Sequence, residues 1–292
     1  MNLHALRVFH TVAKLGGFSL AAEALFISQP AVSKALKELE NQLNIQLIER
    51  GAKGKKLMLT EGGQVLYEHA RSIFAIEKSA IDDIKLRTDL KRGSLIIGTS
   101  TTIAGYWLPD YLAKFCAVYP DIKIEVKVAN TAKIEQELLD CAIDLALVEG
   151  EPTEPDITCK HWQNDILSIV MSSSMEPAIN IHTWLSDQHW LLREPGSGTL
   201  EISKELFKQQ NIKIDKSMQL GSNEAIARAV SQGLGVALLP NVVTEELVQL
   251  GKLKRLEPQN NKKISRSLYQ LKYKNRPSSH AANAFEEILF TV

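Results

Sequence analysis

Apolar residues near the start of the chain recur at the spacing of an α-helix. They predict a first amphipathic helix over residues 3–15, and a second, short helix over residues 20–26 with Ser19 as its N-cap. A third helix begins after Ser28, a good N-cap residue, and tolerates Pro30 in its first turn, where a missing N–H does no harm. Two helices joined by so short a turn predict a helix-turn-helix, whose second helix enters the DNA major groove.

The predicted third helix has an apolar face and a polar face. Its apolar residues, Val32, Leu36, Leu39 and Leu43, are expected to point inward. The residues assigned to the DNA contact are Ser28, Gln29, Pro30, Ser33, Lys34 and Lys37. A glutamine pairs with adenine, a lysine binds guanine or phosphate, and a serine is small enough for close approach. The alternative is a solvated polar face with no role in DNA binding.

A β-hairpin is predicted after the third helix, because two short apolar segments flank a tip rich in glycine and lysine. Such a wing lies along the DNA backbone. Arg50 is the expected phosphate contact, with Lys55 and Lys56 as weaker candidates. Residues 1–60 carry eight basic and four acidic side chains, although the whole chain has a formal net charge of zero. A basic end attracts phosphate, but taken alone it is also typical of a solvated face.

One long helix is predicted over residues 61–91. Apolar residues recur there at three- and four-residue steps with no proline. A helix of that length spans about 45 Å, more than a small domain needs. Long amphipathic helices between domains commonly bury their apolar stripe against a copy of themselves. We therefore expect this helix to form a dimer, with an ordinary core helix as the alternative.

Short apolar segments alternate with amphipathic helices from residue 92 onward. This alternation predicts an α/β fold with a mainly parallel sheet and crossover helices, arranged as two small lobes with a cleft between them. The predicted domains are residues 1–60 for DNA binding, 61–91 for the linker helix and 92–292 for ligand binding. Within the last, one lobe takes about 92–161 and 267–292, and the other takes about 162–266.

Hydroxyl-bearing clusters stand at three predicted strand-to-helix junctions. Their candidate ligand-binding residues are Ser100, Thr101 and Thr102, then Gly196, Ser197, Gly198 and Thr199, and finally Ser222 and Asn223. Helix N-termini present free N–H groups and bind anions, and the carboxyl ends of strands in α/β sheets line a common crevice. Serine and threonine are also ordinary N-caps, so any one cluster is explained without a ligand. The three together favour an anion site.

Two further residues are candidates for the cleft because they follow or end predicted strands: Thr131 and Glu149. An acidic side chain beside a bound anion is unfavourable, so Glu149 is expected to accept a proton of the ligand or a hydroxyl of the threonine cluster. Arg193 either helps to bind the anion or points to solvent. Hydroxyl and N–H donors without a lysine suit a compact oxyanion such as sulfite, sulfate or phosphate, with a phosphorylated metabolite as the alternative.

Composition narrows the class of protein. Hydrophobic residues make up 45% and charged residues 23% of the chain, as in a packed globular protein. A run of about eighteen apolar residues, a signal-peptide pattern and a CxxC pair are all missing from the sequence. We expect a cytoplasmic protein with no membrane association. Catalytic motifs and metal-ligand spacings do not stand out, so we expect no enzyme, metal or cofactor. A two-lobed enzyme and a solute-binding protein are the weaker alternatives.

Several motifs resemble those of the LysR-type transcriptional regulators. In the N-terminal part they are Ala21–Leu25, Ser28–Ser33, Leu39–Glu40 with Leu43, Leu47–Arg50 and Leu59–Gly62. Ile48 departs from the family pattern, which usually has Phe there, and is expected to change volume more than function. In the C-terminal part, Ser100–Pro109, Leu192–Thr199 and Leu220–Ile226 resemble a subgroup that regulates carbon fixation and sulfur assimilation.

The resemblance covers nearly the whole chain. It implies a winged helix-turn-helix, a dimerising linker helix and a two-lobed effector domain like that of periplasmic binding proteins. It also implies a homodimer or homotetramer that acts on double-stranded promoter DNA, with RNA polymerase as a further partner. A small anionic effector would change promoter DNA bending and transcription. A sulfite- or sulfate-like oxyanion is favoured, and a phosphorylated sugar or other carboxylate metabolite is the alternative.

Overall fold

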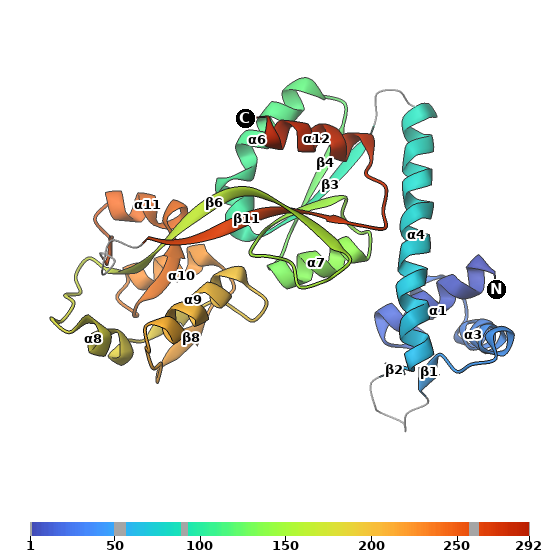
Figure 1. Ribbon diagram of the computed structural model, residues 1–292, viewed down its shortest axis with the longest axis horizontal. Helices are drawn as coiled ribbons and strands as arrows, with labels where there is room; N and C mark the ends of the chain where they lie inside the picture. The colour runs from blue at the N-terminus through green and yellow to red at the C-terminus, as the bar shows by residue number, and fades with distance from the viewer. Residues whose placement is uncertain (1, 50–56, 89–92, 257–262, 292) are drawn as a thin grey trace. The chain divides into compact units, whose positions relative to one another are not determined.

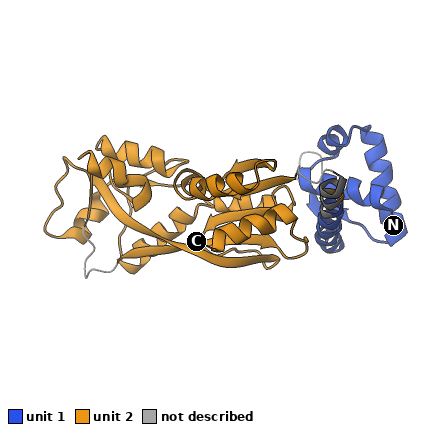
Figure 2. Cartoon of the chain, turned by 90° about the horizontal axis from the view of Figure 1, so that it is seen from above, with its two compact units in different colours: residues 1–80 blue, residues 81–292 orange. Residues whose placement is uncertain are grey.

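Three helices open the chain: α1 (Leu3–Leu15), α2 (Phe18–Ala24) and α3 (Gln29–Leu43). Two short strands, β1 (Ile48–Glu49) and β2 (Met58–Leu59), and the long helix α4 (Glu61–Thr88) follow. The computed structural model describes residues 2–49, 57–88, 93–256 and 263–291. The chain forms two units, residues 1–80 and residues 81–292 (Figure 2).

Apolar residues of the first three helices form the core of the first unit. Fully buried side chains there include Leu6, Phe9, Val12, Val32 and Leu39. The inward stripe predicted for α3 is confirmed for Val32, Leu36 and Leu39, whereas Leu43 is only half-buried. This packing fixes which side of α3 remains available to a partner.

The second helix begins earlier than predicted, and Gly17 rather than Ser19 is its N-cap. The backbone of Gly17 is extended, and its carbonyl accepts a hydrogen bond from the Ala21 amide at 3.1 Å. Ser19 therefore lies inside the first helical turn. After α2 ends, Phe26 adopts the left-handed conformation with φ of 56°, which turns the chain toward Ser28.

The predicted hairpin is confirmed where the structure describes it. Ile48 pairs with Leu59 and Glu49 pairs with Met58 in antiparallel register. Both Arg50 and Lys55 of the predicted wing fall outside the described residues. The long helix is confirmed over the 28 residues of α4.

The second unit alternates strands and helices. Its strands are β3 (Ser94–Thr99), β4 (Lys123–Val128), β5 (Leu145–Glu149), β6 (Ile157–Ser172), β7 (Trp190–Leu192), β8 (Ser217–Gln219), β9 (Ala237–Pro240), β10 (Leu253–Arg255) and β11 (Ile264–Tyr273). Its helices are α5 (Thr101–Tyr106), α6 (Leu108–Val118), α7 (Thr131–Leu139), α8 (Ile181–Asp187), α9 (Gly198–Gln209), α10 (Asn223–Ser231), α11 (Asn241–Gln249) and α12 (His280–Phe290). Apolar periodicity did not predict α8 or β10, which are short.

The largest sheet is mixed, so the prediction of a mainly parallel sheet is wrong. Its strand order is β10-β6-β11-β5-β3-β4, with β9 also paired to β6. Only β3 with β4 and β3 with β5 are parallel pairs in it, whereas β6 and β11 run antiparallel from Ile157↔Tyr273 to Leu167↔Ile264. The sequence could not reveal this pairing because the two strands are far apart along the chain. A separate parallel pair joins β7 and β8.

The long strands β6 and β11 run through both parts of the second unit (Figure 1) and contribute residues to a hydrophobic core in each. In β6, Trp162 packs in the core that contains β3, α6 and α12, whereas Leu167 and Ile169 pack in a core with Trp190 and α9. In β11, Leu268 belongs to the first core and Ile264 packs against the second. The second unit thus has two lobes, and the residues where β6 and β11 pass between the cores lie at their junction.

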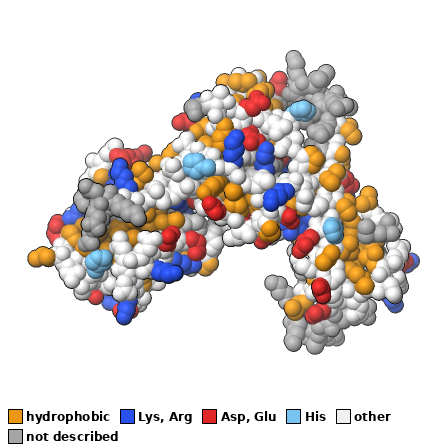
Figure 3. Space-filling model, viewed as in Figure 1, with side chains coloured by type: hydrophobic (Ala, Val, Ile, Leu, Met, Phe, Trp, Pro, Cys, Tyr) orange, Lys and Arg blue, Asp and Glu red, His pale blue; other side chains and the backbone are white. Residues whose placement is uncertain are grey.

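Charged side chains of both signs are interspersed on the face of the second unit seen in Figure 3. Among the described residues, no helix is long and apolar enough to cross a bilayer, and no cluster of three or more histidine, cysteine or acidic side chains is arranged to hold a metal ion. Buried charged side chains lie together at the junction between the lobes.

Candidate functional site

The polar face of α3 is open to a partner. Ser28, Gln29, Pro30, Lys34 and Lys37 are exposed, and Ser33 is half-buried. The Ser28 hydroxyl accepts a hydrogen bond from the Ala31 amide at 3.3 Å, as an N-cap does. Lys34 lies 3.9 Å from Glu38 on the next turn, but both side chains are mostly exposed, so this pair is weak and easily exchanged for a phosphate.

The three hydroxyl-bearing clusters converge in the second unit. Asn223, at the start of α10, is fully buried. Its side-chain amide donates to the Thr102 hydroxyl of α5 at 2.8 Å and to the Thr199 hydroxyl of α9 at 3.2 Å. One residue from each cluster thus meets at a single point between the lobes.

A glycine lets α9 approach the opposite lobe. A Cβ atom on Gly198 would lie 2.8 Å from Cβ and 2.9 Å from the carbonyl oxygen of Glu149. The neighbouring Gly196 has a φ of 87°, and its carbonyl accepts from the Ala132 amide at 3.2 Å. Thr131 donates its hydroxyl to the Glu149 carbonyl at 3.4 Å. The predicted residues Thr131, Glu149, Gly196 and Gly198 therefore lie together.

Glu149 itself is bound by the first cluster. The Ser100 hydroxyl donates to Oε1 of Glu149 at 2.8 Å and also accepts from the Ile103 amide at 3.1 Å as the cap of α5. Thr101 Oγ1 is buried and makes no hydrogen bond to the described residues. By contrast, the Ser222 hydroxyl accepts from the Ala225 amide at 3.1 Å, and Ser197 is a buried N-cap without a side-chain cap bond.

A buried ion pair that sequence reasoning missed completes the site. The guanidinium of Arg266 on β11 donates to Asp165 Oδ2 on β6 from Nε at 3.0 Å and from Nη2 at 2.8 Å. Its Nη1 donates to the Thr199 hydroxyl at 2.8 Å, and Nη2 lies 3.4 Å from Glu149 Oε1. Arg266 and Asp165 are direct cross-strand partners. In the sequence, Asp165 and Arg266 are visible only as single charged residues within the apolar patterns of the strands β6 and β11.

Burial is the main influence on the pKa of the Asp165 carboxyl. Removal from water raises the pKa of the Asp165 carboxyl, Arg266 opposes that rise, and the nearby charge of Glu149 adds to it. The net direction is upward, because the effect of burial on Asp165 outweighs the attraction of Arg266. One guanidinium faces two acidic groups here.

Arg193 does not point to solvent. It is buried and binds Glu194 through two hydrogen bonds of 2.8 Å, one to each carboxylate oxygen. Burial alone would raise the pKa of Glu194, but the hydrogen bonds and charge of Arg193 outweigh it and lower that pKa. Asn130 also donates to Glu194 at 3.3 Å. Arg193 thus supports the loop between β7 and α9.

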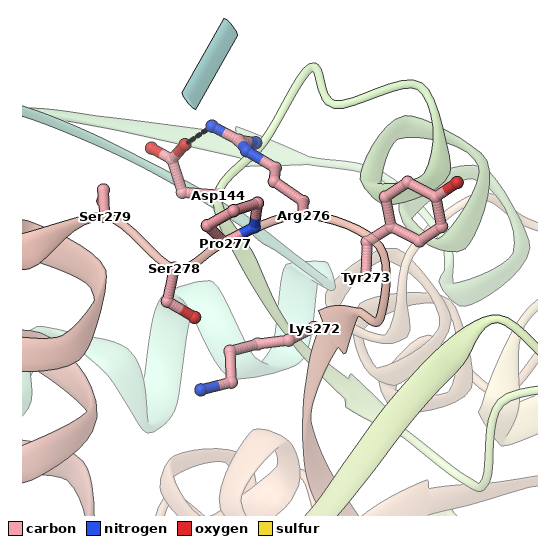
Figure 4. A pocket seen from close by; sticks show the side chains of 7 residues that line it. All are labelled: Asp144, Lys272, Tyr273, Arg276, Pro277, Ser278 and Ser279. Carbon is pink, nitrogen blue, oxygen red and sulfur yellow. Dashed lines mark hydrogen bonds and ion pairs between the residues drawn. The ribbon is translucent and has the colours of Figure 1, made fainter. Parts of the chain in front are cut away.

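A small pocket lies elsewhere in the same unit, between the end of β11 and the start of α12 (Figure 4). Asp144 and Arg276 form an ion pair there, and Asp144 also accepts from the Ile96 amide at 2.8 Å. Arg276 donates to the Ile143 carbonyl at 2.7 Å. These groups bind one another and fasten the C-terminal segment to the sheet.

A helix-turn-helix with an open polar face, together with a two-lobed domain that has a polar interior junction, is typical of a DNA-binding regulator with an effector-binding domain. The chain belongs to the LysR family of transcriptional regulators. Residues 3–64 match the bacterial regulatory helix-turn-helix proteins of the lysR family, and residues 88–291 match the LysR substrate binding domain.

Named relatives are regulators. The chain is 33% identical over 287 residues to the HTH-type transcriptional regulator YeiE of Escherichia coli (strain K12). The matched region covers 98% of this chain and 96% of that protein. It is 33% identical over 242 residues to the HTH-type transcriptional activator CmpR of Synechocystis, covering 82% of this chain and 78% of that one. The protein is accordingly a regulator and not an enzyme.

Solved structures share the fold. The regulatory domain of Synechocystis CcmR in complex with 2-PG has a TM-score of 0.60 and 26% identity, and covers 68% of this chain and 96% of that chain. Full-length CbnR complexed with its target DNA has a TM-score of 0.60 and 20% identity, and covers 99% of both chains. The expected winged helix-turn-helix and two-lobed effector domain are confirmed.

Proposed function

We propose that a small anionic effector binds between the lobes of this LysR-family regulator and changes how the protein acts on promoter DNA. The observation that carries the proposal is the meeting of three hydroxyl-bearing segments with a buried arginine. Arg266 supplies the positive charge that the sequence motifs lacked. The helices α9 and α10 direct their N-termini, with their positive dipole ends, toward the same point.

Hydroxyl protons favour an acceptor ligand. Thr199 Oγ1 already accepts from Asn223 and from Arg266, so its own proton is left for another acceptor. Because side chains of both lobes already lie within hydrogen-bond distance, an oxyanion of the size of sulfite or sulfate fits the space better than a large ligand. The alternative is a phosphorylated sugar or other carboxylate, and the CcmR regulatory domain in complex with 2-PG supports it.

The DNA contact is proposed for Ser28, Gln29, Pro30, Ser33, Lys34 and Lys37, with Arg50 and Lys55 from the wing. Exposure of the polar side of α3 supports this assignment. We place DNA binding in residues 1–60, the linker helix in 61–91 and effector binding in 92–292. A cytoplasmic location follows from the DNA partner.

A homodimer or homotetramer is proposed to act through α4. Val65, Ile76 and Ile81 on this helix are 51%, 54% and 47% exposed, which is costly for apolar side chains unless a second copy covers them. Effector binding would shift the populations of lobe arrangements, change DNA bending and alter access of RNA polymerase. An Ile76→Glu variant should lose the dimer in light scattering, whereas Val118→Glu, at a similarly exposed residue of α6, should retain it.

Calorimetry on the full-length protein tests the effector. Sulfite, sulfate, phosphate and a sugar phosphate are titrated in turn, and DNase protection of promoter DNA is compared with and without each anion. The proposal predicts saturable heat from at least one anion and a change in the protected region. Absence of heat from every anion would overturn it.

A further inference from the structure

The junction between the lobes contains more hydrogen-bond acceptors than a site for a fully deprotonated anion needs. Glu149, on β5, is 4% exposed, and both of its side-chain contacts use Oε1. Its Oε2 accepts no hydrogen bond from the described residues. The side-chain oxygen of Asn223 is buried without a partner in the described part of the chain. A ligand at this point must therefore donate as well as accept.

The charges at the junction lead to the same requirement. Arg266 from β11 is the cation that contacts Glu149, and Asp165 from β6 is the other acidic group whose charge acts there. One guanidinium is shared between two carboxyl groups. An anion that presents a deprotonated oxygen to Glu149 places a negative charge against a like charge at short range, which disfavours binding in a site shielded from water.

We propose that the effector is an oxyanion that keeps an ionisable proton near neutral pH and donates a hydrogen bond through it to Glu149. We further propose that this carboxylate excludes sulfate. This rests on the proposed function, because it requires an anion between the lobes. Hydrogen phosphate and hydrogen sulfite carry such a proton, and sulfate carries none. The Thr199 hydroxyl and the N-terminus of α9 bind the deprotonated oxygens, while Glu149 accepts from the protonated one.

Selectivity arises because an anion without a proton, such as sulfate, places an acceptor oxygen against the buried Glu149 carboxylate, which is also an acceptor. A site built to bind a hydroxyl group rejects an analogue without it far more strongly than an apolar pocket rejects a missing methylene. A hydrogen bond to a charged partner is worth enough to change affinity by at least about tenfold. The same geometry disfavours ligands that present only deprotonated oxygens, whatever their size.

The test is a competition of anions on the full-length protein at neutral pH. Sodium phosphate, sodium sulfite and sodium sulfate are titrated by calorimetry, with oxygen excluded so that sulfite is not oxidised. We expect phosphate or sulfite to bind at least about tenfold more tightly than sulfate. In Glu149→Gln, the amide donates to sulfate, so sulfate affinity should rise and the ratio should collapse toward one.

The matched control is Glu135→Gln, which makes the same change at another buried acidic side chain, on α7, that binds Thr153 instead of the cleft. It should keep the wild-type ratio. Sulfate binding to wild type as tightly as phosphate and sulfite would overturn the inference and leave the proposed function standing. If no anion bound, both would fall. The wild-type ratio decides alone if Glu149→Gln does not fold.

Discussion

Asn223 and Thr102 lie 121 positions apart in the sequence, yet the Asn223 amide donates to the Thr102 hydroxyl at 2.8 Å. This bond joins the start of α10 in one lobe to α5 in the other. Since Asn223 is fully buried and also binds Thr199, the arrangement of the lobes depends on a polar contact. A ligand that competes for these hydroxyls would act directly on that arrangement.

Replacement of Asn223 by Ala should destabilise the protein. The change removes both side-chain hydrogen bonds and leaves the buried Thr102 hydroxyl without its Asn223 partner, at a cost of about 1–3 kcal/mol in the free energy of unfolding. Urea unfolding followed by fluorescence measures this. Asn283→Ala, at an exposed residue of α12, is the control. Equal stability of the two variants would contradict the proposed role of the bond.

A methyl group at Gly198 should separate the lobes. Its Cβ would clash with the Glu149 backbone and Cβ, and overpacking of this kind costs about 1–3 kcal/mol. Gly198→Ala should therefore lower the melting temperature and weaken oxyanion binding in the same calorimetric titration. Gly221→Ala is the matched control because a Cβ there meets no atom within 4 Å. If Gly198→Ala had the same melting temperature and oxyanion affinity as Gly221→Ala, the close approach of Gly198 to Glu149 would not contribute to stability or binding.

The face of α3 should determine operator choice. A Gln29→Ala and Ser33→Ala double variant is expected to lose about 1–3 kcal/mol of discrimination for each base pair that it no longer reads, without a large change in melting temperature. Gel-shift titrations against specific and scrambled DNA at one salt concentration measure the ratio. Gln42→Ala, exposed near the other end of α3, should leave it unchanged. Undiminished specificity in the double variant would exclude these residues as base readers.

The carboxyl of Glu135 should make stability depend on pH. Burial is the main cause that raises its pKa above the ordinary value of 4.5, although hydrogen bonds from Thr153 oppose the rise. The folded state then keeps the proton to a higher pH than the unfolded state. Stability therefore falls as pH rises from the ordinary value through the raised one. As the pH rises from the ordinary pKa of Glu135 to its raised value, the melting temperature of Glu135→Gln should increase relative to that of wild type.

Melting curves from acid to neutral pH give this difference directly. Glu201→Gln, at an exposed residue of α9 that pairs with Lys204, serves as the comparison. A difference between Glu135→Gln and wild type that shrank as pH rose would have the opposite sign and would contradict the upward pKa shift.

Phe26 should be replaceable with a gain in stability. Its φ of 56° is unfavourable for a residue with a Cβ, and its side chain is 96% exposed. Asparagine adopts the left-handed conformation more readily, so Phe26→Asn should raise the melting temperature. Ile45→Asn, at another exposed apolar residue of the first unit, is the control for the loss of surface hydrophobicity. Only Phe26→Asn also relieves backbone strain, so only Phe26→Asn should gain stability from that source.

Local patterns were sufficient for the first unit. The 3.6-residue spacing of Val32, Leu36 and Leu39 predicted the buried side of α3, and Ser28 predicted where that helix begins. The error at Ser19 arose because Gly17 is also able to cap a helix, and propensity alone does not choose between them. These features depend on neighbours a few residues away, which the sequence displays.

The cleft was only partly predictable. Hydroxyl clusters after strands are local signals, and Thr102, Thr199 and Asn223 do converge. The prediction of a mainly parallel sheet failed because β6 and β11 pair across about a hundred residues, from Asp165 to Arg266. No local periodicity encodes which distant strand becomes a neighbour.

Spacing within single segments is enough to predict the winged helix-turn-helix, the long amphipathic helix and the hydroxyl-bearing helix starts. Folding of the whole chain brings Arg266 against Asp165 and Glu149 and places Gly198 against Glu149. Strand register and the packing of the two lobes depend on the whole buried core. The charges that they bring together cannot be read from any single segment.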